Sequence, residues 1–371
     1  MKFYRDYPKP SDRMGCLWAV NGIQDACILE FGPAGTTHFS IEGLMQFGEE
    51  IQTKTFTTHM DETDVTFGNE ERLVEGILEI DQVEKPKVLF VMGSSLTSII
   101  GMDIESIVKS LEDQVNCQLI VLPNCDFRKD FRQGIQETLQ ILVKEIVVPT
   151  EIKIPRFNIL CLGLHDFNHP SDLKEIQRLM QLHFGMVLGT TFTLNTSLEA
   201  IEKAGESQVN LVLGEEGLLA AEMLEKDFGQ PFVYGKPYGV EQTDKWLKEL
   251  AQVLGLDYQG DKEASEHQRI RMEEKMLMRQ IKNLKNKKVY LHEGFGPLPA
   301  LKHYLDYLGF QWAETADQAV LRFDNGVEAR GHLNAIQVSH PSFNQKKSYP
   351  YTPMVGYRGA YYLCQEMYNR L

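Results

Sequence analysis

The chain has 371 residues, of which 43% are hydrophobic, and a formal net charge of −14, so it can bury one large core or two or three of ordinary domain size. The acidic balance argues against a nucleic-acid or anionic-membrane partner, because either partner requires a basic face. The apolar runs are far shorter than the roughly 20 residues of a membrane span, and residues 1–10 are too polar for a signal segment, so we expect a cytoplasmic protein.

Short β-branched runs, each followed by a turn and an amphipathic stretch, recur along the first half of the chain. A strand predicted over residues 87–93 leads into a helix over 103–115, and a second strand over 117–122 leads into a helix over 130–145. This order is typical of parallel βαβ units. A proline-bounded stretch then predicts a domain boundary near Pro149.

The second half repeats the pattern and adds a long charged segment without Pro or Gly, which indicates a solvated helix between two domains. The predicted strands cover residues 157–163, 210–213 and 288–292, and the predicted helices cover 171–184, 217–228, 262–287, 300–308 and the end of the chain from Gly356.

Short phosphate-binding motifs are missing from the sequence. It contains neither GxxxxGK[ST] nor a GxGxxG after a predicted strand. The six cysteines include no CxxC pair, so neither a zinc finger nor a disulfide framework is expected. Because the phosphate-binding motifs are missing, any nucleotide chemistry must be supplied by another protein.

Five ordered segments resemble the cluster-binding and closing signatures of nitrogenase component 1 type proteins, a family that includes dark-operative protochlorophyllide reductase and sirohydrochlorin reductive cyclase. Each matches one family element at compatible spacing. They are Cys16 with Phe31 to Thr36, Glu62 to Leu73, Ser95 to Ile104, Cys125 to Gly134, and His340 to Gly359.

The resemblance implies an α/β fold of three Rossmann-like domains with parallel sheets around a central site. We assign residues 1–149 to the first domain, 150–260 to the second, and 261–371 to a linking helix, a shortened third domain and a C-terminal helix. The resemblance also implies a homodimer or a pair of homologous subunits. Electrons would come from a separate ATP-dependent iron–sulfur reductase.

The chain departs from the family at the positions that ligate an iron–sulfur cluster. Soft thiolates suit the cluster irons, but only Cys16 matches a family cysteine, whereas Thr36 and Ser95 carry hydroxyls at the other two positions. One subunit cannot therefore assemble the standard site. Two copies related by a two-fold axis would present Cys16 twice.

Two further cysteines are alternative ligands. Cys27 lies in an apolar run that indicates a buried strand, so a core residue is the favoured interpretation. Cys125 ends a predicted strand, at the edge where open α/β sheets bind ligands. Cys161 and Cys364 are interpreted as packing residues.

Several polar residues are candidates for binding a substrate or cofactor in a central cavity. Arg128 and Arg132 match the carboxylate groups of a ligand through bidentate hydrogen bonds. Solvated ion pairs on a helix surface explain these two arginines equally well. The turn from Gly32 to Gly35 can present backbone N–H groups to an anion, or it can be an ordinary turn between a strand and a helix. The candidates are Gly35, Thr36, His38, Ser95, Arg128, Arg132 and His340.

Three hypotheses of function follow. The first is an oxidoreductase subunit, a homodimer with a metal centre at its interface, that reduces a cyclic or tetrapyrrole-like substrate. The second is a non-redox protein that binds a tetrapyrrole or another metallocofactor, or serves as its scaffold. The third is a general α/β ligand-binding protein. The resemblance implies that true nitrogenase holds its active cofactor with a cysteine in the second domain. Residues 192–204, the corresponding region, contain no cysteine, so we do not expect dinitrogen reduction.

Overall fold

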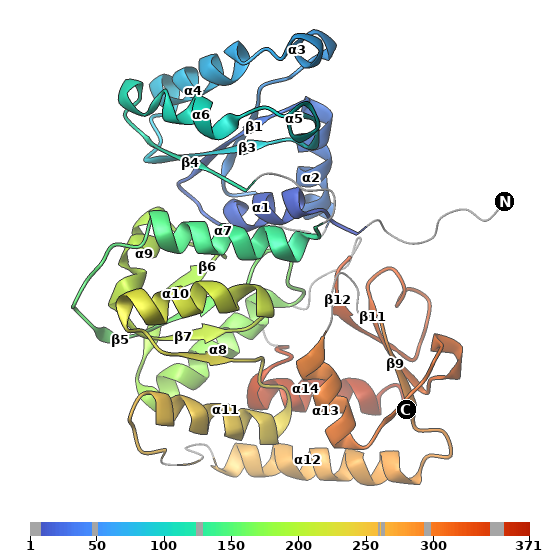
Figure 1. Cartoon of the computed structure of the whole chain (residues 1–371). Coiled ribbons are helices and arrows are strands. Elements are labelled where there is room, and N and C mark those ends of the chain that lie inside the picture. The colour runs from blue at the N-terminus through green and yellow to red at the C-terminus, as the bar shows by residue number, and fades with distance from the viewer. Residues whose placement is uncertain are drawn as a thin grey trace, which may run out of the picture.

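The computed structural model of the chain contains three parallel sheets of four strands each (Figure 1). This confirms the predicted α/β fold class. The structure describes residues 9–46, 51–123, 129–258, 260, 264–292, 298–341 and 352–371. Within these residues, no helix is both long and apolar enough to cross a membrane.

The first sheet has the strand order β2-β1-β3-β4. Its two central strands are buried along their whole length, as expected when helices cover both faces of a parallel sheet. Its strands are β1 (Cys27–Phe31), β2 (Lys54–Thr57), β3 (Val88–Gly93) and β4 (Gln118–Val121), and its helices are α2 (Ala34–Gln46), α3 (Glu62–Phe67), α4 (Glu71–Val83), α5 (Ser95–Ile100) and α6 (Ile104–Lys109), followed by the 3₁₀ helix η1 (Glu112–Gln114).

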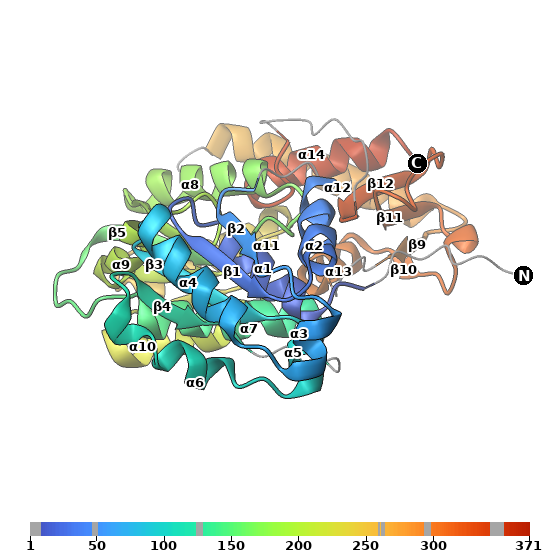
Figure 2. The same cartoon turned by 90° about the horizontal axis from the view of Figure 1, so that it is seen from above.

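Alternate residues of these strands enter two different cores. Leu29 and Val91 pack with α4 and α6, whereas Ile28 and Phe90 belong to the large core that continues into the second sheet. The period of two along a strand accounts for this division. Seen from above, α3 and α5 lie side by side at the carboxyl ends of the strands (Figure 2).

Helices α1 (Asp12–Asn21) and α7 (Phe131–Glu145) pack against each other between the first and second sheets (Figure 1). Glycines permit the close approach. A Cβ atom on Gly15 would lie 1.9 Å from the carbonyl oxygen of Phe131, and one on Gly134 would lie 1.9 Å from that of Asp12. Even alanine would force these helices apart.

The second sheet has the order β6-β5-β7-β8, and its strands end toward the third sheet. Its strands are β5 (Ile154–Leu160), β6 (Val187–Phe192), β7 (Ser207–Val212) and β8 (Phe232–Tyr234), and its helices are α8 (His169–Phe184), α9 (Leu198–Glu202), α10 (Leu218–Phe228) and α11 (Gly239–Val253), with the 3₁₀ helices η2 (Lys203–Glu206) and η3 (Glu215–Gly217).

The third sheet has the order β10-β9-β11-β12 and follows the charged helix that the sequence predicts. That helix is α12 (Ala264–Asn283), and the other elements are β9 (Lys288–Leu291), α13 (Pro299–Leu308), β10 (Gln311–Trp312), the 3₁₀ helix η4 (Ala316–Gln318), β11 (Leu321–Asn325), β12 (Ala335–Ser339) and α14 (Gly356–Tyr368).

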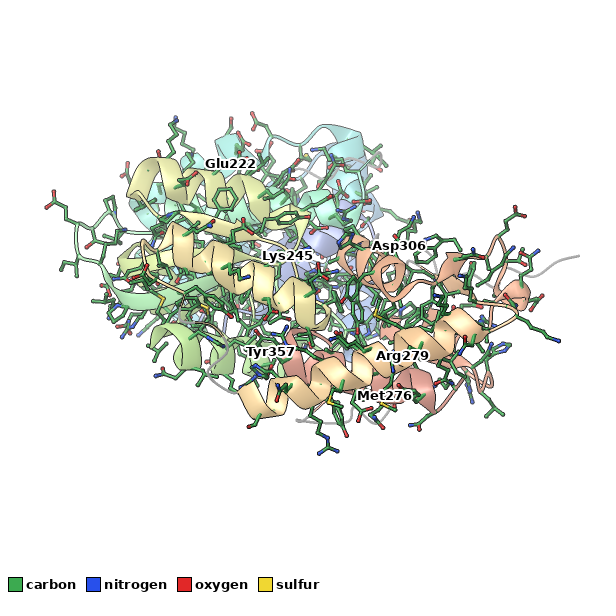
Figure 3. All side chains as sticks on the ribbon, turned by 90° about the horizontal axis from the view of Figure 1, so that it is seen from below. Glu222, Lys245, Met276, Arg279, Asp306 and Tyr357 are labelled. Carbon is green, nitrogen blue, oxygen red and sulfur yellow. The ribbon has the colours of Figure 1, made fainter. Side chains whose placement is uncertain are left out.

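The C-terminal helix α14 returns from the third sheet to helices α8, α11 and α12. Tyr357, which lies beside α12 (Figure 3), holds α14 there. Its hydroxyl donates to Asp244 Oδ1 at 2.6 Å, and its ring stacks on His267 of α12 with 3.5 Å between centroids. The strands of the three sheets fall within the three domains that we assign from the sequence, whereas α14 packs across that assignment. The exact domain boundaries stay a prediction.

Candidate functional site

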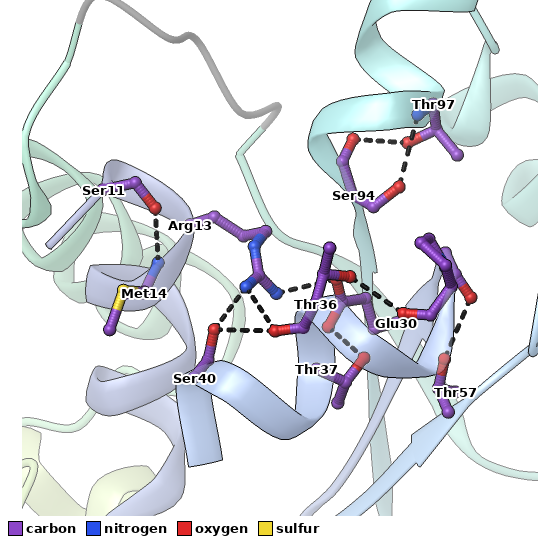
Figure 4. A network of polar contacts seen from close by, with 12 residues as sticks. Ser11, Arg13, Met14, Glu30, Thr36, Thr37, Ser40, Thr57, Ser94 and Thr97 are labelled. Atoms are coloured by element: carbon purple, nitrogen blue, oxygen red, sulfur yellow. Dashed lines mark hydrogen bonds and ion pairs between the residues drawn. The ribbon is translucent and has the colours of Figure 1, made fainter. Parts of the chain in front are cut away.

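The segments that carry the three family cysteine positions, Cys16, Thr36 and Ser95, come together near the carboxyl edge of the first sheet. A buried ion pair lies there. Arg13 Nη1 of α1 is 2.7 Å from Glu30 Oε1 of β1, and the two side chains are 6% and 0% exposed. Arg13 also donates to the carbonyl oxygen of Thr36 at 2.8 Å and to Ser40 Oγ. Glu30 accepts from Thr37 Oγ1 at 2.6 Å and from Thr36 Oγ1 at 3.3 Å (Figure 4).

The hydroxyl residues at two family cysteine positions take part in local structure. Thr36 Oγ1 donates to the carbonyl oxygen of Pro33 at 2.9 Å, and Ser95 is the half-buried first residue of α5. Gly35 is exposed at the start of α2, and exposed His38 lies 3.9 Å from Glu42 on the same helix. These four predicted site residues therefore lie on the first sheet's side of the molecule.

Cys16 points into the contact between α1 and α7. It is 2% exposed, and its thiol donates to the carbonyl oxygen of Gly134 at 3.5 Å. Burial raises the pKa of Cys16 to about 12, so the thiol is protonated at neutral pH. Cys27 is buried in the other core, and burial raises its pKa as well.

An iron–sulfur cluster does not fit the residues described at this edge. Its ligands would have to be thiolates, but the thiols of Cys16 and Cys27 face separate cores, and the Arg13 and Glu30 side chains hydrogen-bond to Thr36 instead. Among the described residues, no group of three or more His, Cys, Asp or Glu side chains is placed to hold a metal ion. Cys125 and Arg128 lie outside the described residues.

A cavity of about 590 Å³ lies between the second and third sheets. One wall comes from the segments that follow β5, β7 and β8, and the opposite wall comes from the start of α13 and the end of β12. Parallel α/β sheets bind ligands at the carboxyl ends of their strands. The volume is within the range of small-molecule and cofactor sites.

Aromatic side chains form much of the apolar lining of the cavity. Phe131 packs edge-on against His165 with 6.0 Å between ring centroids, and Phe167 packs edge-on against His340 at 5.7 Å. The lining also includes Tyr234, Tyr238 and Trp246. The cavity thus offers flat apolar surfaces to a large ligand.

One charged group on the cavity wall joins α7 to η3. Arg132 interacts with Glu216 and, at 2.9 Å, with Glu215, and Glu216 Oε2 accepts from the Cys161 thiol at 3.2 Å. Burial favours the neutral carboxyl, but the hydrogen bond and the charge of Arg132, together with other hydrogen bonds, outweigh it and lower the pKa of Glu216. Burial and the nearby Glu216 raise the pKa of Cys161 well above its ordinary value, so this thiol is a hydrogen-bond donor.

A second charged group follows β5 and β8. Lys236 Nζ lies 2.6 Å from Asp166 Oδ1, and His165 Nε2 lies 3.5 Å from Asp166 Oδ2. Burial opposes both charges, but their mutual attraction lowers the pKa of Asp166 and raises that of Lys236. Burial raises the pKa of nearby Asp172 to about 6.

Three polar atoms in residues that line the cavity are buried and have no hydrogen-bond partner within the described part of the chain. They are Gln242 Nε2, Trp246 Nε1 and Ser339 Oγ. The first two lie on one face of α11, because residues four apart in a helix share a face. Each atom can donate a hydrogen bond, and buried polar atoms usually have partners in native proteins.

Of the predicted site residues, Arg132 and His340 line the cavity together. Sequence reasoning missed Asp166, Lys236 and Cys161. Cys161 directly follows β5 with φ of 58°, although the apolar run around it indicated a strand interior. A strand end followed by a polar residue is the only local signal that marks these positions.

Comparisons with known proteins agree on the family to which this chain is related. Residues 11–316 match the family described as nitrogenase component 1 type oxidoreductase. The chain is 30% identical over 245 residues to the nitrogenase iron-molybdenum cofactor biosynthesis protein NifE of Clostridium pasteurianum, covering 65% of this chain and 53% of the relative. It is 24% identical over 263 residues to one of the subunits of the light-independent protochlorophyllide reductase of Synechococcus sp. (strain JA-3-3Ab), covering 68% and 51%.

The chain spans about half the length of the curated relatives it matches. Among solved structures it is similar to "Nitrogenase Cp1 at pH 6.5", with a TM-score of 0.79 and 20% identity. That likeness covers 100% of this chain and 93% of the other, and it concerns the fold alone.

Proposed function

Because the chain belongs to the nitrogenase component 1 type oxidoreductase family, we propose that it binds a planar macrocyclic cofactor of the tetrapyrrole class in its cavity without reducing it. The observation that carries the proposal is a cavity of about 590 Å³ with aromatic walls. Apolar burial against flat side chains supplies most of the affinity for such a ligand.

The names of two similar proteins support a role in cofactor handling. One relative is a cofactor biosynthesis protein, and another is a reductase of protochlorophyllide, which is a tetrapyrrole. Binding of a large cofactor is the property that these two names share. It requires the cavity but not an interface cluster.

Binding is favoured over reduction because of the residues that occupy the family cysteine positions near the first sheet. A subunit that transfers electrons through a cluster requires several thiolates. Here Cys16 is a buried thiol, and Thr36 hydrogen-bonds to Glu30 and the backbone. These contacts support a structural role for the motif segments.

The test is an anaerobic titration with protoporphyrin IX, followed by its absorbance. Ala300 lies at the start of α13 and lines the cavity, so Ala300→Trp fills part of the binding space. We expect saturable binding by the wild-type chain and at least about tenfold weaker binding by this variant. Ala200→Trp on α9, away from the cavity, is the matched control and keeps wild-type affinity. Equal affinity of both variants would place the ligand elsewhere.

A second candidate function is the oxidoreductase subunit, and the match of Cys16 to a family cysteine favours it. In this case two copies, or a copy and a homologous subunit, share a metal centre, and an ATP-dependent iron–sulfur reductase supplies electrons. Cys16 would first have to leave its contact with the Gly134 carbonyl oxygen.

Metal and sulfide analysis of protein prepared without oxygen separates the two candidates. The binding function predicts a protein without stoichiometric iron and sulfide. Iron that disappears in Cys16→Ala, together with partner-dependent turnover, would establish the oxidoreductase instead. Iron unchanged in Cys16→Ala would eliminate Cys16 as its ligand.

A further inference from the structure

The segment after β8 holds two polar side chains at the cavity. Gly235 and Gly239 have φ of 118° and 74°, a region that glycine adopts without strain, so the chain turns sharply at both ends of the segment. Between them, the Pro237 carbonyl oxygen accepts from the Gly356 N–H at 2.8 Å. Lys236 and Tyr238 on either side of Pro237 both line the cavity.

Lys236 is a fixed cation in the cavity wall. Its ammonium group has three N–H donors, and Asp166 Oδ1 at 2.6 Å accepts one of them. Asp166 is itself held by the Gly163 N–H at 3.0 Å. The lysine side chain keeps 20% of its surface exposed and lines the cavity.

Tyr238 supplies a neutral donor beside this cation. The residue is 7% exposed, and its hydroxyl has no hydrogen-bond partner within the described residues. Burial raises the pKa of Tyr238 to about 12, while the charge of Lys236 acts in the opposite direction. The phenol therefore stays protonated next to a positive charge.

Besides Asp166, which is paired with Lys236, Asp172 is a nearby carboxyl group that would repel an anion. Its Oδ1 accepts from the Met354 N–H at 2.7 Å and from Asn168 Nδ2 at 3.2 Å. These donors turn one carboxyl oxygen toward the segment before α14. Burial raises the pKa of Asp172 to about 6, so protonation of this carboxyl costs less near neutral pH than protonation of an ordinary aspartate.

We infer that Lys236 and Tyr238 form a subsite that binds a carboxylate substituent of the cavity ligand. Two donors, one charged and one neutral, match the two oxygens of a carboxylate. The inference rests on the proposed function, because it assigns a chemical feature to the ligand of the same cavity.

The experiment compares protoporphyrin IX with its dimethyl ester, in which both carboxylates are blocked. We expect the wild-type chain to bind the free acid about tenfold or more tightly than the ester, as a charge-assisted hydrogen bond implies. Tyr238→Phe should weaken binding of the acid about threefold to tenfold and leave the ester unchanged. The double variant Lys236→Met/Asp166→Asn, which removes both members of the ion pair, should abolish the preference for the acid.

Control variants keep the chemistry of the change but lie away from the cavity. Lys248→Met on the exposed side of α11 and Tyr361→Phe on α14 should retain the wild-type preference. Equal binding of acid and ester by the wild type, or a preference that survives in the Tyr238 and Lys236 variants, overturns the subsite alone. If neither compound binds, the proposed function fails and the subsite with it.

Discussion

Two polar regions of the molecule lie at comparable places, each at the carboxyl ends of a parallel sheet, yet they are built differently. At the first sheet, Arg13 and Glu30 direct their hydrogen bonds to each other and to neighbouring threonine, serine and backbone groups. At the second sheet, Lys236 and Asp166 are paired but remain 20% and 16% exposed beside a cavity. The first region is closed and structural, and the second is open.

This difference shows that a motif position does not by itself define a binding site. The segments that resemble the family's cluster signature form the closed region. Most of the open region is assembled from segments that match no such motif, and only Arg132 and His340 in it were singled out by the resemblance. Each prediction below tests one side of this comparison.

The largest effect is expected from Arg13→Met, because it leaves the carboxylate of Glu30 buried without its counter-ion. Removing one partner of a buried ion pair costs about 3–5 kcal/mol. We expect the free energy of unfolding to fall by that amount in urea titrations. The double variant Arg13→Met/Glu30→Met should recover part of the loss, since it leaves no buried charge.

Lys203→Met is the control for this experiment. Lys203 pairs with Glu199 on the surface, with side chains 53% and 68% exposed, and such pairs contribute about 0–1 kcal/mol. An Arg13 variant no less stable than the Lys203 variant would show that the closed region is not structural.

The next effect concerns Asp172 on the cavity side. Burial raises the pKa of its folded-state carboxyl from 3.8 to about 6, so the folded chain binds the proton more tightly than the unfolded chain. This stabilisation is complete below pH 4 and is lost as pH rises through 6. A shift of this size corresponds to up to about 3 kcal/mol.

Asp172→Asn removes this titration while its amide oxygen can still accept from the Met354 N–H. We expect the variant and the wild type to have similar free energies of unfolding at pH 4, and the variant to become the more stable of the two above pH 6. The measurement is denaturant unfolding of both proteins across this range. A difference that does not change with pH would remove Asp172 from our account of the cavity.

A third prediction tests the packing that buries Cys16. Gly134→Ala places a methyl group where the Asp12 carbonyl oxygen lies 1.9 Å from the Cβ position. We expect a loss of about 1–3 kcal/mol, as for other over-packed cores, and faster reaction of Cys16 with a thiol reagent. Unchanged stability and unchanged labelling would mean that the α1–α7 contact is looser than the structure indicates.

Much of the fold was predictable, because each element has a local cause. The helix predicted from residue 130 begins at Phe131 after the N-cap Asp130, whose side chain accepts from the Arg132 N–H at 3.0 Å. The helix predicted over 103–115 is less regular. It divides into α6 and the 3₁₀ helix η1, because the α-helix ends at Lys109 with Ser110 as its C-cap, and apolar periodicity does not mark this end.

The candidate site was only partly predictable, because its contacts are distant in sequence. Lys236 meets Asp166 across 70 positions, and no spacing rule connects them. Cys161 lies in an apolar run whose strand ends one residue earlier, at Leu160. Arg132 was found because it follows Phe127, where the resemblance implies side chains that face a substrate or cofactor. Arg13 belongs to no motif, and its pairing with Glu30 becomes visible only in three dimensions.

The smallest effect is expected from Gly35→Ala. A glycine turn that binds an anion through its backbone would lose the ligand when a side chain is added. The structure instead leaves open space around the Cβ position of Gly35, and the residue lies in the first turn of α2. Alanine has the higher helix propensity, so we expect a gain of about 0.5–1 kcal/mol.

The same variant also distinguishes the two regions by ligand binding. Because Gly35 lies at the first sheet and the cavity lies between the other two, Gly35→Ala should bind protoporphyrin IX with wild-type affinity. A large loss of affinity in this variant would move the binding site to the first sheet, and the region that we describe as closed would then be the open one.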